Sequence, residues 1–293
     1  MSRANSHFLK CQLSNNHHLA FNLLGNKLGY PILYCHGLPG SRLEAQLACE
    51  AATKLGIRII AVDRPGFGES TFQPNRQMSD WVNDVTKLLQ HLEIERFSVM
   101  GISGGCPYAM LLGEHLFHRI DKLGLVSGLG NLSDKANVKS IGLVLRAYIN
   151  LARRFSHTSY FVNRYVTYRF MKLLPQLTMK LALLEGPQID RDVLKNAKTH
   201  DIILNSFMEA IKQDGKGAAW DLYLATKQWQ ARPENVKTDT YLWHGNLDTT
   251  VPPIMAHDHA KRIANCDAKF LANEGHFSLP IRHMDTILAT LAP

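Results

Sequence analysis

The pentapeptide Gly101-Ile102-Ser103-Gly104-Gly105 limits what this chain can fold into more than any other stretch. It follows an apolar run at 97–100 and precedes a segment, from Cys106 onward, that is typical of a helix start. A serine in this strand-turn-helix setting is held in strained backbone geometry, with its hydroxyl pushed out of the sheet. Glycines on both sides give the chain room to turn. The pattern predicts that Ser103 is a nucleophile at the end of a strand.

Strands and helices are predicted to alternate on both sides of this turn. Two short antiparallel strands are expected within 7–24, followed by strands at 30–35, 57–62, 96–100 and 120–126 and helices at 42–55 and 79–92. Ser41 and Ser79 are expected to cap those two helices. The later part adds strands at 240–243 and 268–271 and helices at 253–264 and 278–291. This order predicts an α/β fold with a mostly parallel central sheet and helices on both faces.

Residues 131–232 interrupt the alternation, because they have helical periodicity and no convincing strand. A length of 293 residues suits one large α/β domain with an insertion. We therefore expect a core whose first part is 1–130, a helical cap or lid at 131–232, and a second core part at 233–293.

Positive charge is concentrated in the first half of this insertion. Between Asn131 and Lys180 there are nine Lys and Arg residues against one acid, Asp134, so this stretch accounts for the whole net charge of +8. A basic segment with interleaved aromatic residues can bind nucleic acid or lie on a membrane surface. We expect a solvated helical face instead, with no nucleic-acid partner; peripheral membrane contact through the basic cap is the weaker alternative.

The remaining composition excludes several other classes. The five cysteines are scattered and form no C-x-x-C pair, so neither a disulfide framework nor a zinc site is indicated. Two histidine pairs, at 115 and 118 and at 257 and 259, lack a convincing third ligand, and we expect no metal. No integral membrane segment is expected, and Met1–His7 lacks the apolar core of a signal peptide. Cytoplasmic residence is the expected default.

Two late loops each follow a predicted strand and supply an acid and a base. Asp248 lies in the loop after 240–243, and His276 lies in the loop after 268–271. Loops after the carboxyl ends of parallel strands gather at one edge of the sheet, so both should meet Ser103 there. His276 would take the serine proton, and Asp248 would hold the imidazole. Asp258 lies within a predicted helix and is expected at the surface.

Stabilising the oxyanion of such a reaction needs two backbone N–H donors. The amides of Leu38 and Gly104 are the expected pair, because Gly104 follows the nucleophile and Leu38 lies in the turn after the first parallel strand. His36 is expected to shape this turn by hydrogen bonding.

On these residues the chain resembles the α/β-hydrolase superfamily, in its serine-nucleophile, esterase-like branch with a helical cap. The matching stretches are 36–40 (HGLPG), 63–70 (DRPGFGES), the pentapeptide at 101–105, and the loops that carry Asp248 and His276. The octapeptide at 214–221 (DGKGAAWD) is also similar to one found in a set of bacterial hydrolases. The resemblance implies a Ser-Asp-His triad, an α/β-hydrolase fold and no cofactor.

We therefore expect a serine hydrolase that cleaves a small or medium carboxylic ester through an acyl-enzyme on Ser103, with a small-molecule, ester-like substrate as its partner. A thioesterase, an amidase and a C–C bond hydrolase would use the same three residues and stay open. A serine at this position argues against the dehalogenases and epoxide hydrolases that share the resemblance. A cofactor-independent oxygenase would need His276 but tolerate loss of Ser103. A ligand sensor that retains the pocket is the alternative outside enzymes. The sequence leaves the oligomeric state open.

Overall fold

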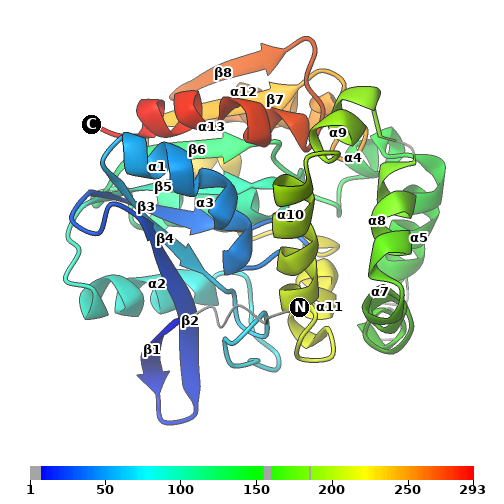
Figure 1. The fold of residues 1–293 in the computed structure, drawn as a ribbon, viewed down its shortest axis with the longest axis horizontal. Coiled ribbons are helices and arrows are strands. Elements are labelled where there is room, and N and C mark those ends of the chain that lie inside the picture. The colour runs from blue at the N-terminus through cyan, green and yellow to red at the C-terminus, as the bar shows by residue number, and fades with distance from the viewer. Residues whose placement is uncertain (1–7, 155–159, 185) are drawn as a thin grey trace.

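The computed structural model describes residues 8–154, 160–184 and 186–293, so the expectation for Met1–His7 falls outside the described residues. An eight-stranded sheet runs through the molecule, with helices on both faces (Figure 1). Its strands are β1 Leu9–Ser14, β2 His17–Gly25, β3 Tyr30–Cys35, β4 Ile57–Val62, β5 Phe97–Ile102, β6 Ile120–Val126, β7 Thr240–Gly245 and β8 Cys266–Leu271.

The sheet is mostly parallel, as predicted. The strand order is β1-β2-β4-β3-β5-β6-β7-β8. β2 pairs antiparallel with both β1 and β4, and all pairings from β4 to β8 are parallel. The carboxyl ends of β3 to β8 therefore lie at one edge of the sheet.

Helices cover both faces of this sheet because its central strands are apolar at consecutive positions. In β4, Ile59 packs on one face and its neighbour Ile60 packs on the other, as the twofold period of a strand requires. The covering elements are the 3-10 helix η1 Arg42–Ala48, α1 Cys49–Lys54, α2 Asp80–His91, α3 Cys106–His115, α12 Pro253–Arg262 and α13 Ser278–Leu291. The first face packs on α1 and α13, and the second packs on α2 and α3.

Between β6 and β7 the described residues form helices and no strand. These elements are α4 Lys135–Ser140, α5 Leu143–Arg154, the π-helix η3 Asn163–Thr167, α7 Tyr168–Leu173, α8 Pro175–Leu183, α9 Gln188–Val193, α10 Ala197–Ala210, α11 Lys216–Ala225 and the short 3-10 helix η4 Pro233–Asn235. The helices α4, α5 and α7 to α11 stand together at one side of the sheet in Figure 1. We call all the elements between β6 and β7 the insertion; its division from the core at residues 131 and 232 stays a prediction.

Two local expectations need adjustment. The segment predicted as one helix at 42–55 begins as a 3-10 helix; its Arg42 N–H donates to Asp63 Oδ1 at 2.7 Å. Ser41 caps it as expected, since its hydroxyl accepts from Leu43 N–H. Ser79 occupies the N-cap position of the next helix, as expected, but its side chain makes no capping hydrogen bond. Before the helix, the carboxylate of Asp80 accepts the Gln77 N–H.

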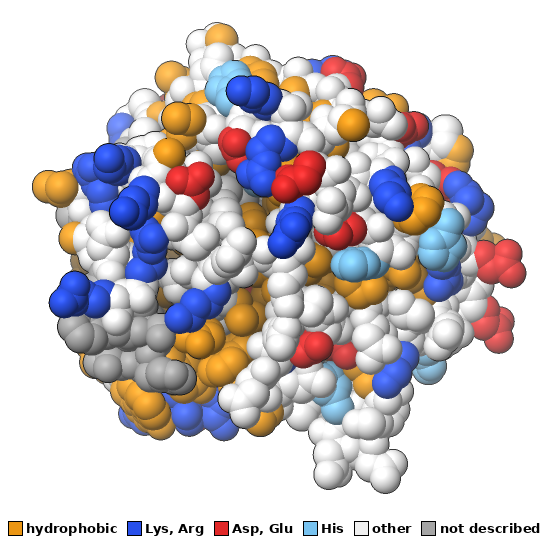
Figure 2. Space-filling model, turned by 180° about the vertical axis from the view of Figure 1, so that it is seen from behind, with side chains coloured by type: hydrophobic (Ala, Val, Ile, Leu, Met, Phe, Trp, Pro, Cys, Tyr) orange, Lys and Arg blue, Asp and Glu red, His pale blue; other side chains and the backbone are white. Residues whose placement is uncertain are grey.

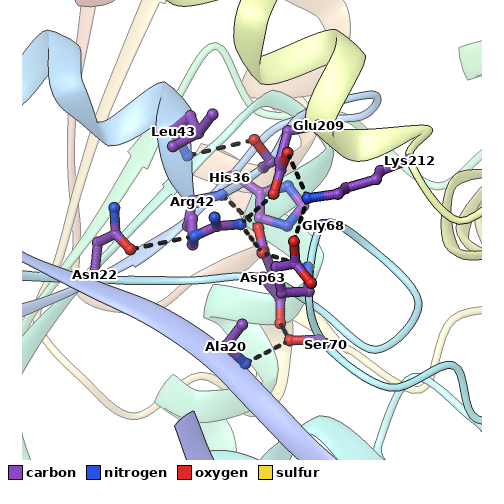
Figure 3. Close-up of polar contacts among 12 residues, drawn as sticks. Ala20, Asn22, His36, Arg42, Leu43, Asp63, Gly68, Ser70, Glu209 and Lys212 are labelled. Carbon is purple, nitrogen blue, oxygen red and sulfur yellow. Dashed lines mark hydrogen bonds and ion pairs between the residues drawn. The ribbon is translucent and has the colours of Figure 1, made fainter. Parts of the chain in front are cut away.

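A buried ion-pair network joins the insertion to the core near β4 (Figure 3). The Arg42 guanidinium, in a side chain only 1% exposed, pairs with Asp63 of the core and with Glu209 of α10, the latter at 2.8 Å. Lys212 extends the network by pairing with Glu69. Because a buried carboxylate is costly without a partner, Arg42 stabilises the position of the Asp63 loop and of α10 at once.

We expect Arg42→Met, which keeps much of the side-chain volume, to lower the free energy of unfolding by about 3–5 kcal/mol, because it leaves the buried Asp63 carboxylate without its cation. Urea unfolding followed by circular dichroism measures this. Arg96→Met is the matched control, since Arg96 pairs with Asp121 at an exposed position and its loss should cost about 1 kcal/mol or less. Equal costs for the two variants would contradict a stabilising role for the buried network.

Candidate active site

Ser103 lies directly after β5, at the start of the short 3-10 turn η2 Ser103–Gly105 that leads into α3. Its φ is +52°, in the left-handed region that non-glycine residues rarely adopt. A β-carbon on Gly105 would lie 2.1 Å from the carbonyl oxygen of Cys35, so α3 can start this close to β3 only with glycine there. The predicted strand-turn-helix, with a strained serine at its tip, is what the structure contains.

His276 and Asp248 are in direct contact in loops at the same edge of the sheet. Nδ1 of His276 lies 2.8 Å from Oδ2 of Asp248. The other carboxylate oxygen, Oδ1, accepts the N–H groups of Thr250 and Val251 at 2.9 and 2.7 Å, which fixes its orientation. Burial of His276 disfavours its protonation, but the Asp248 carboxylate outweighs this effect and raises the pKa of the imidazole.

Ser103 and His276 line one cavity of about 450 Å³, here called the Ser103 pocket. The described residues contain no hydrogen bond between the Ser103 hydroxyl and His276, a bond that in hydrolases often tightens only when substrate binds. The pocket walls are mostly apolar. The core contributes Leu38, Pro39, Ile102, Phe277 and Ile281, and the insertion contributes Ile141, Ile149, Met171, Ile203 and Phe207.

The two predicted oxyanion donors lie side by side at this pocket. A β-carbon on Gly104 would be 3.2 Å from the Leu38 amide nitrogen and 2.6 Å from Leu38 Cβ. Within the described parts of the chain the Leu38 N–H donates to no acceptor, so it is available to a ligand. Only a glycine directly after Ser103 allows the Leu38 turn to come this close.

His36 shapes the Leu38 turn and is unsuited to proton transfer. Its Nδ1 lies 2.9 Å from the carbonyl oxygen of Gly37, and its Nε2 accepts the Arg64 N–H at 3.2 Å. Burial, with the Arg64 cation as a second cause, lowers its pKa well below the usual value. The imidazole therefore stays neutral and acts as a structural hydrogen-bonding group, as expected.

The octapeptide at 214–221 connects the insertion to this same turn. Asp221, at its end, accepts from Arg64 Nε at 2.7 Å, and Arg64 Nη2 in turn donates to the carbonyl of Gly37 at 2.9 Å. Arg76 also pairs with Asp221. Gly217, in the middle, packs on the loop after β4 so closely that a β-carbon would lie 2.4 Å from a backbone carbon of Gly66. Sequence reasoning noted the octapeptide but not this role.

A second acid of the insertion, Asp190 of α9, holds the His276 loop. Its carboxylate, in a residue only 1% exposed, accepts the N–H groups of His276, Phe277 and Ser278 at 2.9, 3.0 and 2.8 Å. A β-carbon on Gly275 would lie 2.5 Å from both carboxylate oxygens. Sequence reasoning missed Asp190, since nothing in its neighbourhood distinguishes it from the exposed Asp192.

His257 and His259, one of the histidine pairs noted in the sequence, do not line the Ser103 pocket. His259 is buried with Nε2 3.1 Å from the Leu129 carbonyl oxygen, and the His257 ring stacks on Phe270. In the part of the chain that the structure describes, no cluster of His, Cys, Asp or Glu could hold a metal, and no helix is long and apolar enough to cross a bilayer.

None of the nine Lys and Arg residues between 131 and 180 lines the Ser103 pocket. Most of their side chains are exposed, and Lys and Arg side chains are visible on the face shown in Figure 2. Their position agrees with a solvated face; whether they contact a membrane stays a proposal.

The comparisons with known proteins agree with this architecture. A family model described as alpha/beta hydrolase fold matches residues 30–281. The chain therefore belongs to the α/β-hydrolase family, which confirms the resemblance drawn from its motifs.

Solved structures share the fold over nearly the whole chain at low sequence identity. A bromoperoxidase from Bacillus anthracis has a TM-score of 0.71 at 18% identity, covering 97% of this chain and 98% of that one. A thermophilic esterase from Thermogutta terrifontis has a TM-score of 0.67 at 19% identity, covering 98% and 96%. These likenesses show the fold alone.

Two curated relatives are similar over shorter stretches. An uncharacterized hydrolase of Bacillus subtilis, YcgS, is 32% identical over 101 residues, which cover 34% of this chain and 35% of the relative. A putative proline iminopeptidase of Mycoplasma pneumoniae is 34% identical over 139 residues, covering 41% and 44%. The chain thus spans less than half the length of these relatives. Together with the family match they support a hydrolase and leave the bond it cleaves undefined.

We expect Asp190→Asn to speed amide hydrogen exchange of Phe277 and Ser278 by about tenfold or more, since a hydrogen bond to a charged group contributes about 1.5–3 kcal/mol. Exchange measured by NMR or mass spectrometry reports this directly. Asp192→Asn is the control on the same helix, because Asp192 is exposed and bonds Gln188 and Lys195 instead. Similar exchange in both variants would rule out Asp190 as the group that holds this loop.

Proposed function

We propose that this protein is a serine hydrolase that cleaves a small or medium carboxylic ester through an acyl-enzyme on Ser103. The observation that carries the proposal is the 2.8 Å contact between His276 and Asp248, at a pocket that also holds Ser103. An imidazole oriented by a buried carboxylate is the base that a serine hydroxyl needs to become a nucleophile at neutral pH.

In the proposed mechanism the Ser103 oxygen attacks the substrate carbonyl carbon while Nε2 of His276 takes the hydroxyl proton. The carbonyl oxygen becomes an oxyanion, and the N–H groups of Leu38 and Gly104 donate to it. The bond to the alcohol then breaks, and His276 gives its proton to the leaving oxygen. Water, deprotonated by His276, then attacks the acyl-enzyme carbonyl. As the bond to Ser103 breaks, His276 returns the proton to the Ser103 oxygen, which releases the carboxylic acid and restores the free serine.

Asp248 acts through His276 in this scheme. With Nδ1–H donated to Asp248 Oδ2, Nε2 is left as the proton acceptor. The same carboxylate stabilises the imidazolium that forms in each step, and the backbone bonds from Thr250 and Val251 keep it from turning away.

The size and walls of the Ser103 pocket support the substrate class. A cavity of about 450 Å³ with mostly apolar walls suits an apolar acyl or aromatic group. In this proposal the insertion is a cap whose apolar side chains close the pocket and exclude water. An esterase shares this fold, which makes an ester the first substrate class to test. The proline iminopeptidase among the relatives makes an amide substrate the one to test beside it; thioester and C–C bond cleavage would use the same residues.

We expect a fluorophosphonate probe to form a covalent adduct on Ser103 and Ser103→Ala to abolish that adduct. Ser79→Ala, which changes a serine outside the pocket, should be labelled like the unchanged protein. Intact-protein and peptide mass spectrometry locate the adduct. A folded protein that does not react, or an adduct that survives Ser103→Ala, would overturn the serine-hydrolase proposal. A panel of p-nitrophenyl esters and matched anilides then separates esterase from amidase activity.

We expect kcat/KM to increase with pH on the acid side, because His276 must be neutral to accept a proton. The midpoint should lie above about 6.5, the usual value for histidine, since Asp248 raises the pKa of His276. Asp248→Asn should reduce kcat by a factor on the order of 10⁴. Asp258→Asn is the control, as Asp258 pairs with Arg262 on α12 outside the pocket, and should change little. A midpoint below 6.5 would contradict this role of Asp248.

A further inference from the structure

Glu44 of η1 is an acidic side chain in the wall of the Ser103 pocket, and the proposed mechanism gives it no role. The residue is 6% exposed. Among the described residues that line the pocket, Glu44 and His276 are the two that can carry charge near neutral pH, and no lysine or arginine lines it. A carboxyl group in an otherwise apolar wall determines which polar groups a ligand can place there.

The Glu44 carboxyl is held in a fixed position and keeps unused acceptor capacity at Oε2. The Gly37 N–H lies 3.2 Å from each of its oxygens, and the Tyr34 hydroxyl donates to Oε1 at 3.0 Å. Oε2 therefore has the Gly37 N–H as its one partner among the described residues, although a carboxylate oxygen can accept about two hydrogen bonds.

Oε2 of Glu44 and the side chain of Ser103 both lie close to Gly37. A β-carbon on Gly37 would be 3.2 Å from Glu44 Oε2 and 3.7 Å from Ser103 Cβ. The side chains of Glu44 and Ser103 are therefore separated by about the space that one methyl group would occupy. The same Gly37 precedes Leu38, the oxyanion donor. A group bound at Oε2 would therefore lie next to the scissile carbonyl of a substrate.

We propose that Glu44 determines specificity in this pocket: it accepts a hydrogen bond from a donor group, an ammonium or a hydroxyl, next to the scissile carbonyl, and it excludes a carboxylate from that position. The substrate class named here rests on the proposed function. The basic residues of the insertion do not reverse this selection, because none of them lines the pocket.

The surroundings of Glu44 give this selection a pH dependence. Burial raises the pKa of Glu44 to about 7, although the Gly37 N–H, the Tyr34 hydroxyl, and the charges of Arg64 and His276 all favour the ionised form. Glu44 is neutral below that value and a carboxylate above it, so affinity for a cation should rise as pH increases through about 7. Protonated His276 faces the same cavity and also repels cations at low pH, so its contribution must be separated.

The experiment compares three inert ligands of one chain length, hexylammonium, hexan-1-ol and hexanoate, whose charges stay constant between about pH 6 and pH 8. Dissociation constants are measured by calorimetry on the Ser103→Ala protein, which cannot turn over. At about pH 8 we expect hexylammonium to bind most tightly and hexanoate at least tenfold more weakly. Hexanoate binding as tightly as hexylammonium would overturn the proposal without any further variant.

Glu44→Gln in the Ser103→Ala background should reduce the ratio of the hexanoate to the hexylammonium dissociation constant by about tenfold or more. It should also remove the part of the pH dependence of hexylammonium affinity that is due to Glu44, and leave the part that is due to His276. Asp84→Asn is the matched control, since Asp84 is also a buried acid whose pKa is raised to about 7 but does not line the pocket. An unchanged ratio in Glu44→Gln, or an equal change in Asp84→Asn, would refute the assignment.

These binding measurements need no catalysis, so they separate the two proposals. If the fluorophosphonate fails to label Ser103 but head-group selection is present, the proposed function fails and Glu44 still defines a ligand site. If Ser103 is labelled and the three ligands have similar dissociation constants, the hydrolase proposal is supported and the proposed role of Glu44 is refuted.

Discussion

The buried carboxylate of Asp221 is the interaction on which the geometry of this site depends most. A carboxylate removed from water is stable only with several strong partners, and Asp221 has Arg64, Arg76 and the Tyr108 hydroxyl. Arg64 is itself buried and uses its remaining donors on the carbonyls of the turn that precedes Leu38. Leu38, the proposed oxyanion donor, is therefore held in place by an acid on α11, a helix of the insertion, as well as by the core strand that leads to it.

The same arrangement recurs at two other loops. Asp190 accepts three backbone N–H groups from the His276 loop, and Glu209 shares Arg42 with Asp63 in the loop after β4. Each of these acids comes from a different helix of the insertion. Asp190 binds the His276 loop directly, whereas Asp221 and Glu209 pair with Arg64 and Arg42 and so hold the loop after β4. Because Asp190 and Asp221 are buried and Glu209 is only slightly exposed, a shift of the insertion would leave these charges unpaired. The insertion thus builds the site rather than only covering it.

The contacts between the insertion and the core explain which parts of the fold and of the site could be predicted from the sequence. Ser103, Asp248 and His276 each lie in the loop that follows a strand. A parallel sheet brings such loops to one edge, so local pattern and topology together predict that the three residues meet. The partners of Asp190 and Arg64 lie 86 and 157 residues away in the chain. No local pattern encodes contacts between an insertion and a core, so Asp190 and Asp221 cannot be distinguished from surface acids in the sequence. Glu44 was missed because it lies in a segment where helical periodicity alone suggests a covering helix.

The charge of the insertion also shows what the sequence alone could not predict. Summed along the sequence, its first half is strongly basic, which suggests attraction of anions. In the structure its basic side chains point mostly to solvent, whereas the acids Asp190, Glu209 and Asp221 point inward, and the pocket wall carries the further acid Glu44. The net charge summed along the sequence does not distinguish basic side chains at the surface from acidic side chains in the interior. Because charges in water are screened and those in an apolar wall are not, the one carboxyl beside Ser103 outweighs the basic surface in selecting what enters the pocket.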